Sequence, residues 1–274
     1  MTMTQHEKAL RFQELHRKPG VFLIPNPWDA GSARLLAGLG FEAFATSSAA
    51  AAGVLGRRDG RMTREESLAN ARIILEATEL PVAADLEHGF GDDPATAAET
   101  IRLAAEIGLV GGSIEDARPY REKPIYDIAL ATERVAAAVQ AARSLPFPFT
   151  LAARAENYVR GNPNLDDTIK RLVAYEQAGA DVLFAPGLPD LAAVRAVCSA
   201  VSKPVNFAVG GRGRSFSVAE LVEAGVKRIS FAAFFYRAAM TGLMEAAQEA
   251  QTKGTFSFVD RAMTTPELNR YFPE

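Results

Sequence analysis

The chain repeats one pattern along most of its length: a short apolar run, then a longer Ala-rich amphipathic stretch. The short runs suit strands that are buried on both faces, and the longer stretches suit helices that cover them. We expect strands over 21–25, 43–46, 81–85, 110–115, 149–153, 181–185, 204–208 and 227–231. We expect helices over 29–39, 63–80, 94–108, 127–143, 165–179, 188–200, 217–225 and 232–250. Such strand–helix repetition predicts an α/β fold, a (β/α)8 barrel.

The same pattern indicates how the chain is organised. No run rich in Pro, Ser and Gly divides it, so we expect one domain over residues 1–274. An early amphipathic stretch over 6–15 predicts a helix that closes the bottom of the barrel, and a helical extension follows the last repeat. The longer connections at 47–62, 116–126 and 154–164 follow strands, which places them on the face where barrel active sites lie.

Composition excludes several classes of function. Thirty Lys and Arg against 33 Asp and Glu give a net charge of −3, so nothing favours binding to nucleic acid or to a membrane surface. The single cysteine, Cys198, cannot form an internal disulfide or a cysteine metal cluster. No apolar stretch is long enough to span a membrane, and the first residues are polar. We therefore expect a cytoplasmic protein.

Charged residues stand at the ends of three successive predicted strands. Asp85 and Glu87 end the third, Glu115 ends the fourth and Arg154 ends the fifth. The carboxyl ends of barrel strands meet at one rim, and oxygen ligands suit Mg2+ or Mn2+ better than Zn2+. A metal-dependent site is one interpretation. The other is a salt-bridge network in which Arg154 pairs with Glu115 or Asp85.

Two further segments are candidates for binding. The connection after the second strand, over 46–53, contains only small residues, which would let backbone N–H groups approach a ligand. Taken alone, the segment favours the alternative, a closely packed turn. Gly210–Arg214, after the seventh strand, suits either a phosphate site or a mobile basic turn.

At this point the residues match a known pattern. Five segments occur in order: 25–34 (PNPWDAGSAR), 45–49 (ATSSA), 84–91 (ADLEHGFG), 113–116 (SIED) and 153–154 (AR). Together they resemble the isocitrate lyase/phosphoenolpyruvate mutase superfamily over about residues 21–244. The resemblance implies a (β/α)8 barrel whose last helix is exchanged between subunits, in a homotetramer of two swapped dimers. It also implies Mg2+-dependent chemistry on α-oxo acids.

By position, the resemblance also implies roles for individual residues. The metal-binding set, for Mg2+ or Mn2+, comprises Asp85 as direct ligand with Glu87 and Glu115 holding the metal's waters. The substrate-binding set comprises Thr46, Ser47, Ser48, Arg154 and Asn206, with Arg154 on the substrate carboxylate. The catalytic set comprises Asp59, Glu115 and Arg154.

The sequence departs from the specialised branches of this superfamily in the loop over 116–126. That loop lacks the Cys of isocitrate lyases, and it lacks the Lys directly after Glu-Asp and the later Asn of phosphonate enzymes. Ala185-Pro186 stands where the mutase has a His-Ser. Any proton must then come from water, Tyr120 or a rim group such as His88. We therefore expect a Mg2+-dependent lyase that decarboxylates or cleaves small α-oxo or 2-hydroxy di- or tricarboxylates. The alternatives are a phosphonate enzyme and a non-catalytic α-oxo-acid-binding barrel.

Overall fold

The computed structural model describes residues 3–118, 122, 124–211 and 215–272. Its strands run parallel in one sheet, in the order β1-β8-β7-β6-β5-β4-β3-β2. They are β1 (Phe22–Ile24), β2 (Phe44–Ala45), β3 (Val82–Asp85), β4 (Gly111–Glu115), β5 (Thr150–Arg154), β6 (Val182–Phe184), β7 (Val205–Ala208) and β8 (Arg228–Ser230). The two ends of this order approach each other, because the Ala45 N–H donates to the Pro25 carbonyl at 3.1 Å. The predicted α/β barrel is confirmed, nearly closed.

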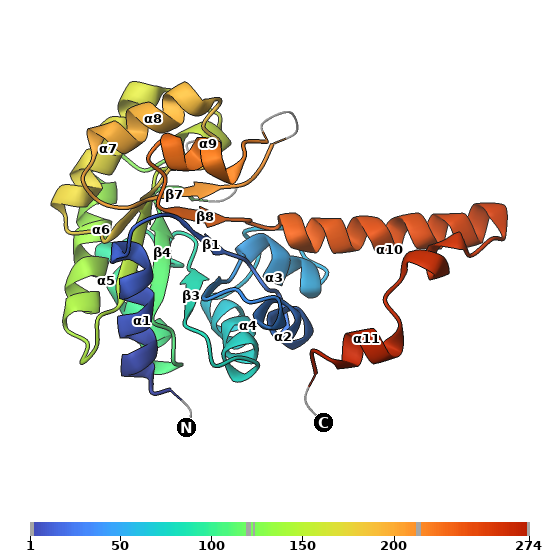
Figure 1. Cartoon of the computed structure of the whole chain (residues 1–274). Helices are drawn as coiled ribbons and strands as arrows, with labels where there is room; N and C mark the ends of the chain where they lie inside the picture. The colour runs from blue at the N-terminus through green and yellow to red at the C-terminus, as the bar shows by residue number, and fades with distance from the viewer. Residues whose placement is uncertain (1–2, 119–121, 123, 212–214, 273–274) are drawn as a thin grey trace.

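Helices follow the strands around the outside of the barrel (Figure 1). They are α2 (Ala30–Gly38), α4 (Arg64–Glu76), α5 (Pro94–Glu106), α6 (Ile128–Arg143), α7 (Leu165–Gln177), α8 (Leu191–Ala200) and α9 (Val218–Glu223). Local sequence sets where they begin. Asp29 caps α2, and Thr63 and Glu66 form a capping box at the start of α4.

The segment over 47–62 is not wholly a loop, so that part of the prediction was wrong. Its first half forms helix α3 (Ser48–Val54), and the Ser47 hydroxyl accepts a hydrogen bond from the Ala50 N–H at 3.4 Å. Alanine is the best helix former, and serine is a strong N-cap. A short 3-10 helix, η1 (Asn157–Arg160), likewise interrupts the connection after β5.

Helix α1 (Gln5–Arg17) packs against the starts of the strands, as the early amphipathic stretch predicts. Its Phe12 is fully buried in a cluster with Phe22, Ile24 and Ala43. The ring of Phe12 comes so close to β4 that a side chain at Gly111 would meet it at 2.9 Å. The floor of the barrel is therefore filled by side chains of α1.

The C-terminal segment extends beyond the barrel and returns to it, where Tyr271 lies against Gly38 of α2. Helix α10 (Phe234–Lys253) projects away from it, and η2 (Ser257–Arg261) and α11 (Thr265–Asn269) turn back beside it (Figure 1). None of the residues of α10 is buried. Neither α10 nor any other helix in the described ranges is both long and apolar enough to cross a membrane.

Two adjacent glycines of β4 test the packing of the floor. A Cβ at Gly111 would lie 2.8 Å from the Thr150 carbonyl oxygen and 2.9 Å from the Phe12 ring, whereas one at Gly112 would press mainly on a flexible Leu86 methyl at 2.7 Å. Gly111→Ala should lower the free energy of unfolding by about 2–3 kcal/mol, because a backbone carbonyl cannot rotate away. Gly112→Ala is the matched control, expected to cost less than about 1 kcal/mol in urea unfolding. Equal costs would contradict this account of the floor.

Candidate functional site

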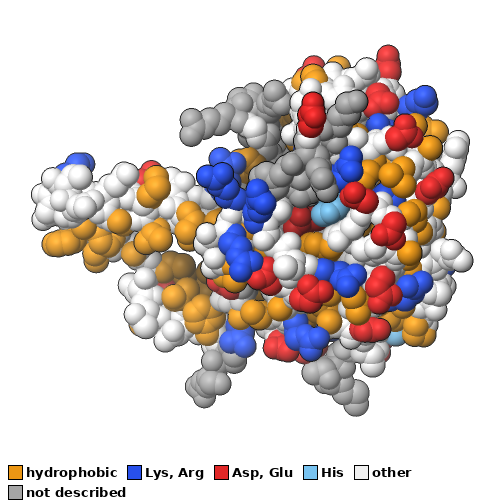
Figure 2. Space-filling view, turned by 180° about the vertical axis from the view of Figure 1, so that it is seen from behind, with side chains coloured by type: hydrophobic (Ala, Val, Ile, Leu, Met, Phe, Trp, Pro, Cys, Tyr) orange, Lys and Arg blue, Asp and Glu red, His pale blue; other side chains and the backbone are white. Residues whose placement is uncertain are grey.

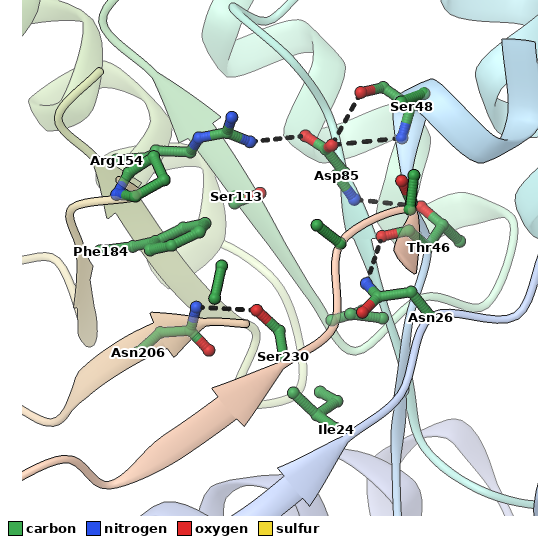
Figure 3. Close-up of a pocket in the computed structure, with 18 of the residues that line it drawn as sticks. Ile24, Asn26, Thr46, Ser48, Asp85, Ser113, Arg154, Phe184, Asn206 and Ser230 are labelled. Atoms are coloured by element: carbon green, nitrogen blue, oxygen red, sulfur yellow. Dashed lines mark hydrogen bonds and ion pairs between the residues drawn. The ribbon is translucent and has the colours of Figure 1, made fainter. Parts of the chain in front are cut away.

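A cavity of about 300 Å3 opens at the carboxyl ends of the strands (Figure 3). It exists because many inward positions carry small side chains, among them Ala45, Ala83, Ser113 and Ala208. Most of the predicted site residues line it: Thr46, Ser47, Ser48, Asp59, Asp85, Arg154 and Asn206. Sequence reasoning did not assign several others that line it, namely Asn26, Phe184, Arg228, Ser230 and Arg237.

Asp85, at the end of β3, lies at the centre of the polar side of this cavity (Figure 3). Its Oδ2 accepts hydrogen bonds from the Ser48 N–H at 3.2 Å and from the Ser48 hydroxyl at 2.9 Å. Its own N–H donates to Thr46 Oγ1 at 3.1 Å. Arg154 Nη1 lies 3.7 Å from Asp85 Oδ1. The structure thus brings together residues from the ends of β2, β3 and β5.

Glu87 has an unusual backbone and an unusual environment. Its φ of 48° is left-handed, a conformation that non-glycine residues adopt only under constraint. Its Oε1 is buried without a hydrogen-bond partner. Burial, followed by the charges of Asp85 and Asp59, raises the pKa of its carboxyl to about 8. Carboxylates thus gather here without enough positive charge to balance them, which suits a cation.

Arg154 belongs to a buried network of ion pairs at the end of β5. Its Nη1 lies 3.3 Å from Glu115 Oε2, and its Nε donates to Glu156. Arg160, from η1, contacts the same two carboxylates, at 3.0 Å on Glu115 and 2.9 Å on Glu156. Burial and the neighbouring Glu156 raise the pKa of Glu115 well above its usual range. Burial opposes the charge of Arg154, but Glu156 and Glu115 outweigh it and raise the pKa of the guanidinium. The salt-bridge alternative is therefore present, and Arg154 still faces the cavity.

Glu156 is a key residue that sequence reasoning left unassigned. It is fully buried, and it contacts both Arg154 and Arg160. The available signal was its position two residues after Arg154, the same spacing that joins Asp85 and Glu87. At the end of β5, Glu156 holds Arg154 in place.

Asp116 links three parts of the barrel through hydrogen bonds of its side chain. Its carboxylate accepts hydrogen bonds from the Glu156 N–H at 2.8 Å, from Arg171 at 3.0 Å and from the Tyr175 hydroxyl at 2.6 Å. These bonds join the end of β4 to the segment after β5 and to α7. They fix where Glu115 and Glu156 lie relative to each other.

The loop over 116–126 is pinned at its base. Ala117 and Ile125 form an isolated antiparallel bridge, and the Tyr126 N–H donates to the Asp116 carbonyl at 2.8 Å. Tyr120, Arg121 and Lys123 lie outside the described residues, as do Arg212 and Arg214 of the predicted phosphate turn.

Not every predicted residue reaches the cavity surface. Glu87, Glu115 and His88 are absent from the lining of this cavity. In the part of the chain that the structure describes, no three His, Cys, Asp or Glu side chains are arranged as a ready metal-binding group. Burial, then the Arg134 charge, lowers the pKa of His88 to about 4. The metal set Asp85, Glu87 and Glu115 stays a prediction.

Comparison with known sequences shows the family. A sequence model of the phosphoenolpyruvate phosphomutase family matches residues 12–251. The chain belongs to this family.

Individual relatives show how far the likeness extends. One relative of known crystal structure is a Burkholderia cenocepacia protein described only as a lyase/mutase. It is 53% identical over 98% of this chain and 97% of its own, with a TM-score of 0.96. The structure of a 2,3-dimethylmalate lyase is 28% identical over 96% of this chain and 94% of its own, with a TM-score of 0.85. Oxaloacetate decarboxylase 2 of Pseudomonas putida is 27% identical over 90% of this chain and 82% of its own.

Arg154→Lys distinguishes two possible roles of this residue: binding a substrate carboxylate, and neutralising the neighbouring acidic side chains. A lysine cannot present the guanidinium fork to a carboxylate, so oxalate affinity at saturating Mg2+ should fall by about 1.5–3 kcal/mol in calorimetry. Arg160→Lys is the control, because Arg160 contacts the same two carboxylates and is absent from the cavity lining. If both variants alter oxalate affinity equally, Arg154 acts only by neutralising the cluster.

Proposed function

We propose that the protein is a divalent-cation-dependent lyase that acts on small α-oxo or 2-hydroxy di- or tricarboxylates by decarboxylation or carbon–carbon cleavage. The observation that carries this is the pairing of Asp85 with Arg154 over one cavity, their charged atoms 3.7 Å apart. An α-oxo acid offers a carboxylate that suits the guanidinium and two oxygens that suit a metal.

The donor set supports a hard cation such as Mg2+ or Mn2+. The candidate ligands are carboxylates, and the buried Oε1 of Glu87 lacks a hydrogen-bond partner that a cation or its water would supply. Asp85 would hold the cation, with Glu87 and Glu115 behind it. A divalent cation there would act as a Lewis acid on the α-oxo group.

The protein's own residues would position the substrate. Arg154 would hold its carboxylate, with the Nε edge of the guanidinium anchored on Glu156. The backbone around Thr46–Ser48 would bound the site on the other side, where Ser48 already holds Asp85. Asp59, exposed on the cavity lining, is the candidate acid or base at the mouth.

Two features favour decarboxylation or cleavage of an alkylmalate over cleavage of isocitrate. The loop over 116–126 has no Cys, so the group that would protonate a departing carbanion is missing. Decarboxylation of oxaloacetate leaves an enolate that a bound cation would stabilise and that water can protonate, so this reaction tolerates that loss best. Among the relatives, oxaloacetate decarboxylase and 2,3-dimethylmalate lyase have names that match these reactions, beside several that are named 2-methylisocitrate lyase.

Asp85→Ala tests the metal site directly. The variant should abolish Mg2+-dependent binding of oxalate in calorimetry, because the central carboxylate of the site is lost. Asp190→Ala is a suitable control, since Asp190 caps α8 and is absent from the cavity lining. Undiminished oxalate binding by Asp85→Ala would refute the site.

A substrate screen tests the reaction class. With Mg2+, the protein should release pyruvate from oxaloacetate or cleave alkylmalates faster than it cleaves isocitrate. Phosphonopyruvate belongs in the same screen as the substrate of the alternative class. Isocitrate cleavage at rates ordinary for enzymes, about 1–1000 per second, would contradict the argument from the missing cysteine.

We also propose that α10 docks on a second copy of this chain, in a dimer or a homotetramer of swapped dimers. Its exposed apolar residues include Met240, Leu243 and Met244, and Phe256 and Val259 continue the surface in η2 and just before it. Figure 2 shows hydrophobic side chains in a row along the projecting helix. An exposed apolar surface of this kind ordinarily marks a site of contact with another chain.

Light scattering at micromolar concentration should therefore give a mass of two or four times 29.4 kDa. Leu243→Glu, which places a charge on the exposed face of α10, should reduce that mass. Ile73→Glu changes an exposed apolar residue of α4 and should leave it unaltered. A monomeric wild type would refute the proposal.

A further inference from the structure

Arg228 is a buried cation whose position the proposed chemistry does not explain. It begins β8, points into the barrel and lines the cavity, yet only 7% of the residue is exposed. Its Nε donates to Asn206 Oδ1 at 2.7 Å, and its Nη1 lies 3.3 Å from His16 Nε2. Both partners are neutral, because burial and the Arg228 charge lower the pKa of His16 to about 3.

Two other buried arginines of the barrel have charged partners, and a third, Arg134, donates to three backbone carbonyls. Arg154 contacts Glu115 and Glu156, and Arg171 contacts Asp116. Within residues 3–118, 122, 124–211 and 215–272, no carboxylate forms an ion pair with Arg228. Burying an uncompensated charge costs several kcal/mol, so the fold bears a penalty that an anion in the cavity would relieve.

The cavity provides room for such an anion. In Figure 3, Arg154, Asp85 and Ser48 form one side of the cavity, and Asn206 and Ser230 lie on the other. Asn206 pairs in register with Arg228, and its Nδ2 donates to Ser230 Oγ at 3.0 Å. Small residues such as Ala45, Ala83 and Ala208 line the cavity along with them.

We propose that Arg228, with Ser230 beside it, binds a second carboxylate of the substrate, at the opposite end from the α-oxo acid group. This rests on the proposed function and deepens it, because it names the side chain that would hold the second carboxylate; a monoacid such as pyruvate would fill only half of the cavity. Asn206 is then a positioning residue, because its amide oxygen fixes the Nε edge of the Arg228 guanidinium.

The test compares pairs of α-oxo acids that differ only in whether the end away from the α-oxo acid group carries a carboxylate or a methyl group. The whole protein with saturating Mg2+ is titrated in calorimetry with oxalate, with 2-oxoglutarate against 2-oxopentanoate, and with 2-oxoadipate against 2-oxohexanoate. At least one diacid should bind about tenfold or more tightly than its uncharged match, as expected for a charge-assisted hydrogen bond. In Arg228→Gln this ratio should fall below about threefold, whereas the oxalate affinity should change little.

The outcomes separate this inference from the proposed function. If wild type fails to bind oxalate, the proposed α-oxo acid site fails. If oxalate binds but no diacid gains over its match, or if the gain persists in Arg228→Gln, the second subsite is wrong. If added phosphate tightens 2-oxopentanoate binding while the diacids gain nothing, Arg228 holds a separate anion and the inference is also wrong.

Two further variants address a purely structural role. His16→Phe removes the other contact of Arg228 and should lower the thermal midpoint without changing the diacid-to-monoacid ratio. If Arg228→Gln does not fold, Arg228→Lys keeps the charge but not the planar fork, and the ratio should fall at least about threefold. An unchanged ratio in Arg228→Lys would overturn the assignment.

Discussion

Glu156 binds two arginines at once, and the geometry of the site depends on that sharing. Because the carboxylate is fully buried and occupies the Nε edge of Arg154, the Nη edge is left to face Glu115 and Asp85. Arg160 balances the second negative charge. Two guanidiniums and two carboxylates thus cancel in a region where a lone charge would be costly. Asp116 then fixes this group to β4 and α7 through the Glu156 N–H, Arg171 and Tyr175.

A buried arginine also fixes the turn after β3. Arg134, from α6, is almost fully buried and donates to the carbonyls of Gly91 at 2.6 Å, Asp92 at 2.5 Å and His88. Its guanidinium also lies over the Tyr126 ring, 4.4 Å from the centroid. These contacts constrain the chain immediately after Glu87, which helps to maintain its left-handed backbone. The acidic side of the cavity therefore depends on a helix that does not itself enter it.

The sequence predicts the barrel well, because alternating apolar runs and amphipathic stretches report directly on what each segment buries. Asp85 and Arg154 were also predictable, since they stand at strand ends that topology brings together. The α3 helix was missed because an Ala-rich run bounded by Ser and Gly suits a tight loop as well as a helix. Glu156 and Arg228 were missed for a different reason: their importance lies in which partners fold against them. Arg228 looks like an ordinary polar residue near the start of a strand until its neighbours are known to be neutral.

The filled floor beneath the strands affects how substrate enters the cavity and how products leave it. With Phe12 and His16 of α1 packed under the barrel, the described residues close the cavity at that end, and the exposed Asp59 and Arg237 line it at the other. Molecules must enter and leave such a blind cavity in single file. Whatever occupies the side near Arg228 goes in first and comes out last. When a substrate is split into two fragments, the shape of the cavity then sets the order in which they are released. The last fragment to leave is the one that can compete with the next substrate for the empty cavity.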